Sequence, residues 1–260
     1  KSGSSVYIFK GTPEEIWKEL TTTFDINAIY INKDYEPYAI RRDREVEELL
    51  NKNGINLFRY RDQVIFEENE VVKPDGKPYT VFTPYKNRWL SKLNENRPEN
   101  SLCKPPYQNN FLSCSYSFPS LGEIGFFESH IKVRPYDLSV IPEYHRYRNL
   151  PAADGTSFLS PHLRFGTVSI RKLVKTAMDQ NMIFLNELIW REFFMQILFN
   201  FPHVVTDNFK TVYDDIQWRN DEKEFHRWCN GETGYPIVDA GMRQLNSSGY
   251  MHNRVRMIAA

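Results

Sequence analysis

The sequence predicts a two-part protein: an α/β domain with a parallel, Rossmann-like sheet, followed by an all-helical domain. Strand and helix signals alternate over residues 6–62, the pattern of parallel strands joined by covering helices. After Tyr144 only helix signals remain. Pro, Ser and Asn dominate the stretch between the two parts. We therefore expect an α/β domain over 1–93, a connector over 94–142 and a helical domain over 143–260.

Short apolar runs in the first domain predict its strands. "VYIFKG" (6–11), "AIYINKDY" (28–35) and "INLFRYRD" (55–62) each have strand composition. No strand signal precedes the first run, so the sheet is expected to be incomplete.

Two helices are expected between these strands. One covers 12–24, with Thr12 as N-cap, Pro13 at the first helical position and acidic residues in the first turn. The other covers 41–54 and ends at a glycine. Farther on, the Pro-Asp-Gly of "VVKPDGKPY" predicts a turn or hairpin.

The second domain is expected to consist of helices. Its segments are "SPHLRFGTVSIRKLVKTAMDQ" (160–180), "FLNELIWREFFMQILF" (184–199), "EKEFHRWCNGET" (222–233), "YPIVDAGMRQLNSSG" (235–249) and "YMHNRVRMIAA" (250–260). The last one stops in mid-pattern, without a Gly, Asn or Pro to end it, and no Met begins the chain. We therefore expect an internal fragment of a longer protein, with the helical domain incomplete at its end.

Composition narrows the class of protein. Lys+Arg and Asp+Glu number 33 each, so any nucleic-acid binding must come from local clusters of charge. Three cysteines without metal-ligand spacing predict neither a disulfide framework nor a metal site, and fit a reducing, cytoplasmic compartment. No apolar run is long enough for a membrane span, and no signal peptide is recognisable.

Polar residues interrupt the most apolar helices. Glu187, Trp190 and Arg191 fall at i, i+3 and i+4 and so share a helix face. Asn253 and Met257 are likewise one turn apart. A Glu187–Arg191 pair could simply stabilise its helix, and we interpret the similar Asp239–Arg243 pair as structural. Because unpaired burial of such groups is costly, their accumulation favours a cavity that holds something polar.

A hydroxyl-rich segment precedes one helix. "GTSFLSP" offers Thr156, Ser157 and Ser160 ahead of Pro161. Such a start can bind an anion, for instance a diphosphate. An ordinary capping segment is the alternative, and the segment alone favours that alternative.

Together, "GTSFLSPHLRFG", "NELIWREFF", "GETGYPIVDAGMRQL" and "GYMHNRVRMI" resemble the DNA photolyase/cryptochrome family in order and spacing. "NKDYEP", "RRD" and "VFTPYKNRWL" resemble parts of its N-terminal domain. The resemblance implies an α/β antenna domain, a connector and a helical domain that binds FAD. Members repair pyrimidine dimers in ultraviolet-damaged DNA with blue light, or act as light receptors.

The resemblance also implies roles for individual residues. The residues implied to contact FAD are Tyr144, Thr156, Ser157, Phe158, Leu159, Ser160 and Arg256. Those implied to contact DNA or the lesion are Arg148, Glu187, Trp190, Arg191, Asn253 and Arg254. Glu187, Asn253 and Met257 are the implied catalytic group, and Trp218 is the implied outermost tryptophan of an electron-transfer chain.

Met257 and Asn253 favour the class I cyclobutane-dimer enzymes within this family. Three alternatives remain open: a photolyase that repairs these dimers, a cryptochrome-type receptor without repair activity, and a nucleic-acid-binding module without flavin. Tyr38 and Ala39 depart from the pattern of folate-binding members, which disfavours a methenyltetrahydrofolate antenna and leaves any second chromophore unidentified. Phe184 and Tyr250 stand where Trp is common in the family. The resemblance further implies a monomer, and a flavin site that needs segments beyond residue 260.

Overall fold

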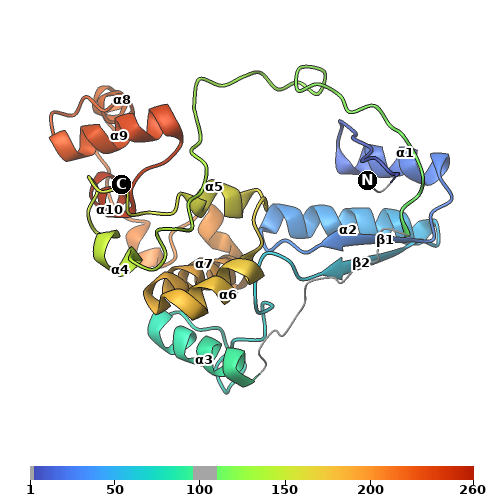
Figure 1. Ribbon diagram of the computed structural model, residues 1–260, viewed down its shortest axis with the longest axis horizontal. Coiled ribbons are helices and arrows are strands. Elements are labelled where there is room, and N and C mark those ends of the chain that lie inside the picture. Colours follow the sequence, from blue (N-terminus) through green and yellow to red (C-terminus); the bar gives the residue numbers. More distant parts are fainter. Residues whose placement is uncertain (1–2, 96–109) are drawn as a thin grey trace. The chain divides into compact units, whose positions relative to one another are not determined.

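The computed structural model describes residues 3–95 and 110–260. Two compact units make up the chain (Figure 1). One comprises residues 1–61 and 68–128, and the other comprises residues 62–67 and 129–260. We refer to them as the α/β unit and the helical unit, and describe each by itself.

A two-stranded parallel sheet forms the centre of the α/β unit. Strand β1 (Ala28–Asn32) pairs with β2 (Asn56–Tyr60), with Ile29 opposite Leu57. Helices α1 (Pro13–Thr23) and α2 (Pro37–Lys52) precede and follow β1, and α2 runs along the strands in Figure 1. The core of the unit is apolar: Ile29, Val46, Leu50 and Ile55 pack with Trp17, Ile26, Ile31 and Leu57. The predicted order strand–helix–strand over this region is confirmed.

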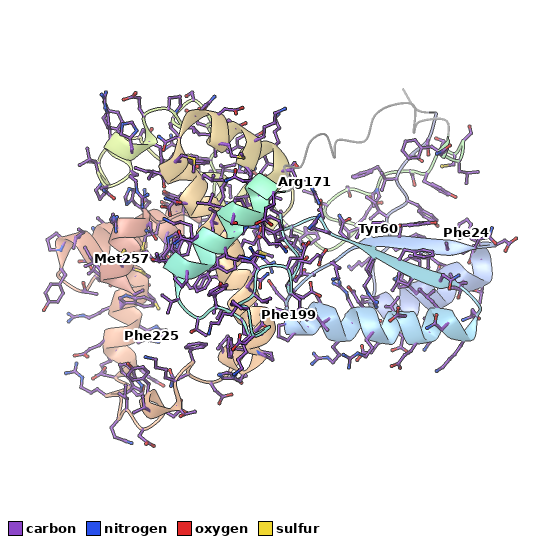
Figure 2. The ribbon with its side chains drawn as sticks, turned by 90° about the horizontal axis from the view of Figure 1, so that it is seen from below. Phe24, Tyr60, Arg171, Phe199, Phe225 and Met257 are labelled. Carbon is purple, nitrogen blue, oxygen red and sulfur yellow. The ribbon has the colours of Figure 1, made fainter. Side chains whose placement is uncertain are left out.

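The opposite face of the sheet is aromatic and exposed. Because successive side chains of a strand point to opposite faces, Tyr30, Phe58 and Tyr60 all lie on the side away from this core. Tyr30 stacks on Phe58 and Tyr60, with ring centroids 5.2 and 6.1 Å apart. All three side chains are exposed; Figure 2 shows Tyr60 on β2.

The start of α1 is as predicted. Thr12 Oγ1 accepts a hydrogen bond from the Glu15 backbone N–H, and the Glu15 carboxylate accepts one from the Thr12 N–H. This reciprocal capping box satisfies two amide donors that a helix start otherwise leaves unpaired.

The strand expected over residues 6–11 is wrong. Residues 5–10 belong to no strand. Side-chain contacts hold this segment instead: the Tyr116 N–H donates to Ser5 Oγ at 2.6 Å, and Tyr7 stacks on Tyr116 at 4.1 Å. A strand requires a continued ladder of backbone hydrogen bonds, which this pairing does not supply.

The turn at Pro74-Asp75-Gly76 is confirmed, and a helix follows that sequence reasoning did not assign. Gly76 has φ 78°, and the Lys73 N–H donates to the Lys77 carbonyl at 2.9 Å. Helix α3 (Phe82–Glu95) buries Tyr85, Trp89 and Leu93 at intervals of four residues. No α-helix or strand lies in residues 111–142, whereas residues 96–109 of the expected connector, with Cys103, lie outside the described residues.

The helical unit begins with short elements. Helix α4 (Tyr144–Tyr147) is followed by α5 (Leu159–Arg164) and α6 (Ile170–Gln180). The segment expected to be helical over 160–180 is helical and is divided into α5 and α6. Gly166 lies between α5 and α6 and has φ 66°. Such a left-handed residue ends a right-handed helix, and glycine adopts this conformation readily.

The longer helices follow. Helix α7 (Met182–Asn200) packs against α6, and two single-turn 3₁₀ helices, Pro202–Val205 and Thr211–Tyr213, lead to α8 (Glu222–Asn230). Helix α9 (Pro236–Ser248) lies beside α8 (Figure 1) and packs on α10 (Asn253–Ala259). No helix in the described part of the chain is both long and apolar enough to cross a membrane.

The contact between α9 and α10 is close. Met242, Met251, Val255 and Ala259 form its buried core. A Cβ on Gly241 would lie 2.5 Å from Val255 Cγ1, so only glycine permits this approach. This packing fixes the position of α10 on α9. Helix α10 carries Asn253, Arg254 and Met257.

Candidate functional site

An ion pair joins α4 to α7. Arg148, directly after α4, lies with its Nη1 2.6 Å from Glu187 Oε1. Their side chains are 19% and 32% exposed, so the pair is partly shielded from water, which strengthens the attraction. The structure thus pairs Glu187 with Arg148 and not with Arg191, the neighbour suggested by helical spacing.

The start of α7 is fixed against the same region. The side-chain oxygen of Asn181 caps α7 by accepting from the Ile183 and Phe184 N–H groups. Its amide group donates to the Ile141 carbonyl at 2.9 Å. This buried asparagine therefore sets the position of α7 relative to the chain that leads into α4.

Tyr144 lies beneath the ion pair. The Arg148 guanidinium carbon is 5.3 Å from the centre of the Tyr144 ring, and Phe184 meets that ring edge-on at 5.0 Å. Burial, with the Glu187 carboxylate as a smaller cause, raises the pKa of Tyr144 to about 12. Its phenol is therefore neutral and available as a hydrogen-bond donor at physiological pH.

Two neighbouring residues of α7 take separate roles. Trp190 is half-buried and stacks on Phe194 with ring centroids 5.5 Å apart. Arg191 instead donates to the Gln63 carbonyl at 2.6 Å, and burial lowers its pKa. The three residues predicted to share one face thus have different partners: Glu187 pairs with Arg148, Trp190 stacks on Phe194, and Arg191 bonds to the backbone of Gln63.

Residues 62–67 form a strap along α7 that sequence reasoning missed. Glu192 is buried and accepts hydrogen bonds from the Ile65 and Phe66 N–H groups, at 2.6 and 3.1 Å. Gln196 donates to the Glu67 carbonyl, one turn farther along α7. The sequence did contain a sign of this contact on α7, namely a glutamate and a glutamine at i and i+4 among Phe, Met and Leu. Residues 62–67, more than 120 residues away, showed no pattern that would identify them as the partners.

Helix α10 carries the other predicted pocket residues. Arg254 donates through Nε to Asn149 Oδ1 at 2.8 Å, and its Nη1 lies 3.5 Å from Met257 Sδ. Asn253 and Arg256 are exposed. Met257 is 67% exposed and labelled in Figure 2. The contacts of Arg148 and Arg254 bring α7 and α10 to the same short turn, residues 148–149.

The cap of α10 is an unusual one. His252 Nδ1 accepts from the Arg254 N–H at 3.1 Å, so the neutral ring carries its hydrogen on Nε2. His252 is 3% exposed, and its Nε2 makes no hydrogen bond of good geometry among the described residues. Burial is the largest cause of a lowered pKa of His252; the Arg148 backbone opposes this effect, and the charge of Arg254 adds to it.

The hydroxyl segment packs against the turn between α9 and α10. The Tyr250 hydroxyl donates to Thr156 Oγ1 at 2.9 Å, and the Tyr250 ring lies 4.7 Å from that of Phe158. Arg134 also contacts Phe158: its guanidinium carbon lies over the Phe158 ring, 4.0 Å from the ring centre.

This packing holds an uncommon backbone conformation. Phe158 has φ 52°, a left-handed conformation that a bulky residue rarely adopts, and it precedes α5 without capping the helix through its side chain. Ser157 and Leu159 are buried, whereas Ser160 is exposed. The chemistry of this segment, hydroxyl donors beside a helix start without a side-chain cap, fits an anionic group.

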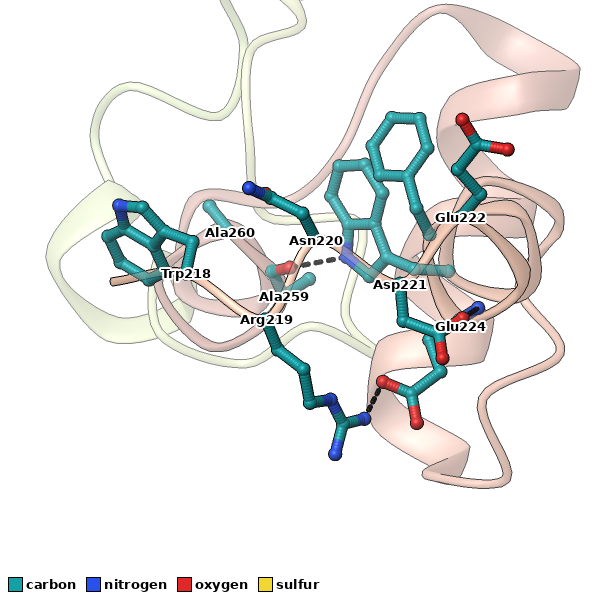
Figure 3. A pocket seen from close by; sticks show the side chains of 10 residues that line it. Trp218, Arg219, Asn220, Asp221, Glu222, Glu224, Ala259 and Ala260 are labelled. Carbon is teal, nitrogen blue, oxygen red and sulfur yellow. Dashed lines mark hydrogen bonds and ion pairs between the residues drawn. The ribbon is translucent and has the colours of Figure 1, made fainter. Parts of the chain in front are cut away.

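Trp218 lies apart from these residues, at a pocket of about 730 Å³. The side chain is 71% exposed. Residues 218–222, Glu224, Phe225, Trp228 and the last two residues of the chain line this pocket (Figure 3). Trp228 Nε1 donates to the Ala259 carbonyl at 2.7 Å, and Arg219 pairs with Glu224. The described residues hold no group of three or more potential metal ligands.

Asp239 makes its hydrogen bonds with the turn that enters α9 rather than with Arg243, the partner suggested by helical spacing. Its carboxylate accepts from the Thr233 N–H and hydroxyl and from the Gly234 N–H, at 2.6–3.0 Å. The Thr233 hydroxyl is the largest cause of a lowered pKa of Asp239. The contacts fix the turn that enters α9.

Comparison with known proteins identifies the family. A family profile described as "DNA photolyase" matches residues 1–105, and one described as "FAD binding domain of DNA photolyase" matches residues 184–260. A deoxyribodipyrimidine photo-lyase from Halobacterium salinarum is 33% identical over 99% of this chain. The chain belongs to the DNA photolyase family.

Solved photolyases share the fold over the whole chain. A bacterial class III photolyase from Agrobacterium tumefaciens superposes with a TM-score of 0.77 at 27% identity, covering 100% of this chain and 58% of that one. An archaeal photolyase from Sulfolobus tokodaii, solved with two FAD molecules, gives 0.72 at 29% identity over 99% and 58%. The chain spans 59% of the Halobacterium relative, so it covers somewhat more than half the length of these photolyases.

Proposed function

We propose that this photolyase repairs cyclobutane pyrimidine dimers in ultraviolet-damaged DNA, using light and FAD. The observation that carries the proposal is the ion pair between Glu187 on α7 and Arg148 after α4, with the Arg148 guanidinium over the Tyr144 ring. It supplies a carboxylate, a guanidinium and a neutral phenol in one place, in a chain whose relative is a deoxyribodipyrimidine photo-lyase. The assignment to class I remains a prediction.

Glu187 would recognise the lesion. A carboxylate accepts hydrogen bonds, and a thymine ring offers its imide N–H. The dimer would reach Glu187 only after flipping out of the duplex, which costs least where the bases are damaged and poorly stacked. Trp190 would recover part of that cost by stacking on the flipped bases. Asn253 and Met257, exposed on α10, would face the dimer from the other side.

FAD would be held by Tyr144, by the segment from Thr156 to Ser160 and by Arg256. The hydroxyls fit the diphosphate, and the exposed guanidinium of Arg256 adds positive charge. When bound, reduced and excited by light, the flavin supplies the electron that splits the dimer, and the electron then returns. Trp218, largely exposed, would relay electrons to the flavin from outside.

Arg148 and Arg254 would bind the DNA backbone. Guanidinium groups suit phosphates because they offer several donors in a planar fork. The hydrogen bond of Arg191 to Gln63 favours a structural role for that residue over direct contact with DNA.

The test is loss of dimers from an ultraviolet-treated thymine oligonucleotide, in blue light and in the dark, with the full-length protein. Repair should require light. Glu187→Ala should slow it roughly ten- to a hundredfold, the value of a hydrogen bond to a charged group. Glu48→Ala, which changes an exposed glutamate of α2, serves as the control.

Other outcomes would favour the alternatives. A protein that binds flavin but repairs nothing in light would favour a cryptochrome-type receptor. A protein that binds damaged DNA without any flavin absorption would favour a binding module.

A further inference from the structure

Residues 148 and 149 are consecutive but reach two different helices. The Arg148 side chain contacts Glu187 on α7, and the Asn149 side chain contacts Arg254 on α10. The turn that bears them is itself fixed. The Arg148 N–H donates to the Tyr144 carbonyl, and the Leu150 N–H donates to the Tyr147 carbonyl, both at 2.9 Å. The backbone that carries the Arg148 and Asn149 side chains is therefore held in place by its own hydrogen bonds.

Asn149 is suited to orient Arg254 without cancelling its charge. The asparagine oxygen is a neutral acceptor, and its 2.8 Å bond takes only the Nε hydrogen of the guanidinium. Of the terminal nitrogens, Nη1 also donates to Met257 Sδ, and the remaining hydrogens stay on a fork whose plane is restrained by both contacts. An unrestrained arginine would lose considerable side-chain freedom on binding a phosphate.

We propose that Asn149 is a positioning residue that orders Arg254 before DNA binds, so that Arg254 meets the sugar–phosphate backbone in a fixed orientation. This inference rests on the proposed function, because it takes a nucleic-acid phosphate as the partner of Arg254. Arg148 and Asn149 together then tie the α7 and α10 walls of the site to one turn.

The test is a double-mutant cycle with the full-length protein: wild type, Asn149→Ala, Arg254→Ala and the double variant. Affinity is measured for an ultraviolet-treated thymine oligonucleotide. Asn149→Ala should weaken binding roughly two- to tenfold. With Arg254 already replaced, Asn149→Ala should have no further effect, because nothing remains to be positioned.

Charge gives a second readout. Asn149→Asp keeps the acceptor but neutralises Arg254, so the slope of log affinity against log salt should become shallower by up to about 0.9, the value of one phosphate contact. Asn149→Ala should leave that slope unchanged. Asn246→Ala, which removes an exposed asparagine bonded to the Cys229 carbonyl, is the matched control.

The outcomes separate the two proposals. Equal losses for Asn149→Ala with and without Arg254 would overturn the positioning role, as would unchanged affinity. A wild-type protein that does not prefer damaged DNA would overturn the proposed function, and this role of Asn149 with it.

Discussion

At the scale of single residues, Tyr250 makes a contact that a tryptophan in its place could not make in the same way. Its hydroxyl donates to Thr156 Oγ1, while its ring packs on Phe158. Because the Thr156 oxygen accepts the Tyr250 hydrogen bond, the hydrogen of the Thr156 hydroxyl points elsewhere and can be donated to another group. Chains of hydroxyls aligned like this strengthen one another.

Tyr250→Phe should therefore weaken FAD binding roughly two- to tenfold, because the ring stays and only the orienting hydrogen bond is lost. Flavin release from the full-length protein, followed by fluorescence on dilution, measures this. Tyr235→Phe changes an exposed tyrosine and should have no effect. Equal flavin retention in Tyr250→Phe and wild type would show that Thr156 needs no orienting partner.

The sequence indicated the residues of the site better than their partners. Glu187, Trp190 and Arg191 stood out because polar groups in an apolar helix demand an explanation. Which partner each one has could not be read from spacing, since Arg148 lies 39 residues from Glu187 and Gln63 lies 128 residues from Arg191. Local periodicity carries no information about contacts at such separations.

At the scale of elements, α10 depends on an imidazole for its cap. The neutral His252 ring accepts at Nδ1 from the Arg254 N–H, and protonation would remove this acceptor and place a charge in a buried site. Because the pKa of His252 is lowered in the folded protein, the unfolded chain takes up this proton at a higher pH than the folded one.

The free energy of unfolding should consequently fall as the pH drops below about 6.5, the ordinary value for histidine. His252→Asn keeps a capping side chain without a titrating group and should flatten this part of the pH profile. Chemical unfolding at a series of pH values from 7.5 to 5 makes the comparison. His226→Asn, at an exposed position of α8, should keep the wild-type slope; if His252→Asn keeps it too, the cap does not titrate as argued.

Helix α7 depends in turn on the strap that covers it. Glu192→Leu would leave the Ile65 and Phe66 N–H groups buried without this acceptor, at a cost of roughly 2–5 kcal/mol in the free energy of unfolding. Glu192→Gln keeps one side-chain oxygen and should cost less. Denaturant unfolding of both variants tests the ranking, and a loss below about 1 kcal/mol for Glu192→Leu would contradict it.

Elements with complete local signals were predicted, and those that depend on partners were not. Thr12, Pro13 and Glu15 define the start of α1 by themselves. The apolar run at 6–11 has strand composition, but within residues 3–95 and 110–260 no neighbouring strand completes a ladder with it. Helix α3 was missed because its three buried residues, Tyr85, Trp89 and Leu93, are separated by polar ones over a short segment that follows a turn.

At the scale of the whole molecule, the balance of charge places the burden of DNA binding on a few arginines. With 33 basic and 33 acidic residues, long-range attraction of the whole chain for DNA is weak. Binding of damaged DNA should still depend on salt, with a slope of log affinity against log salt of roughly −1 on a duplex, because Arg254 has no carboxylate partner in the described part of the chain, whereas Arg148 is paired with Glu187.

Titration of affinity against potassium chloride, on a duplex that contains one dimer, measures the slope. Arg254→Ala should make it shallower by about 1. A response that does not change with salt would mean that neither arginine binds a phosphate.

The strap also bears on how the molecule can be divided. Residues 62–67 belong to the helical unit, yet they lie in the chain between two pieces of the α/β unit. Any single cut that releases residues 129–260 leaves the strap on the other fragment, and Glu192 loses the Ile65 and Phe66 N–H donors. During synthesis, likewise, these six residues leave the ribosome long before α7 exists to receive them. The order of segments along the chain therefore differs from the order of the two units. The helical unit is complete only when residues 62–67, which are synthesised before the rest of it, have packed on α7.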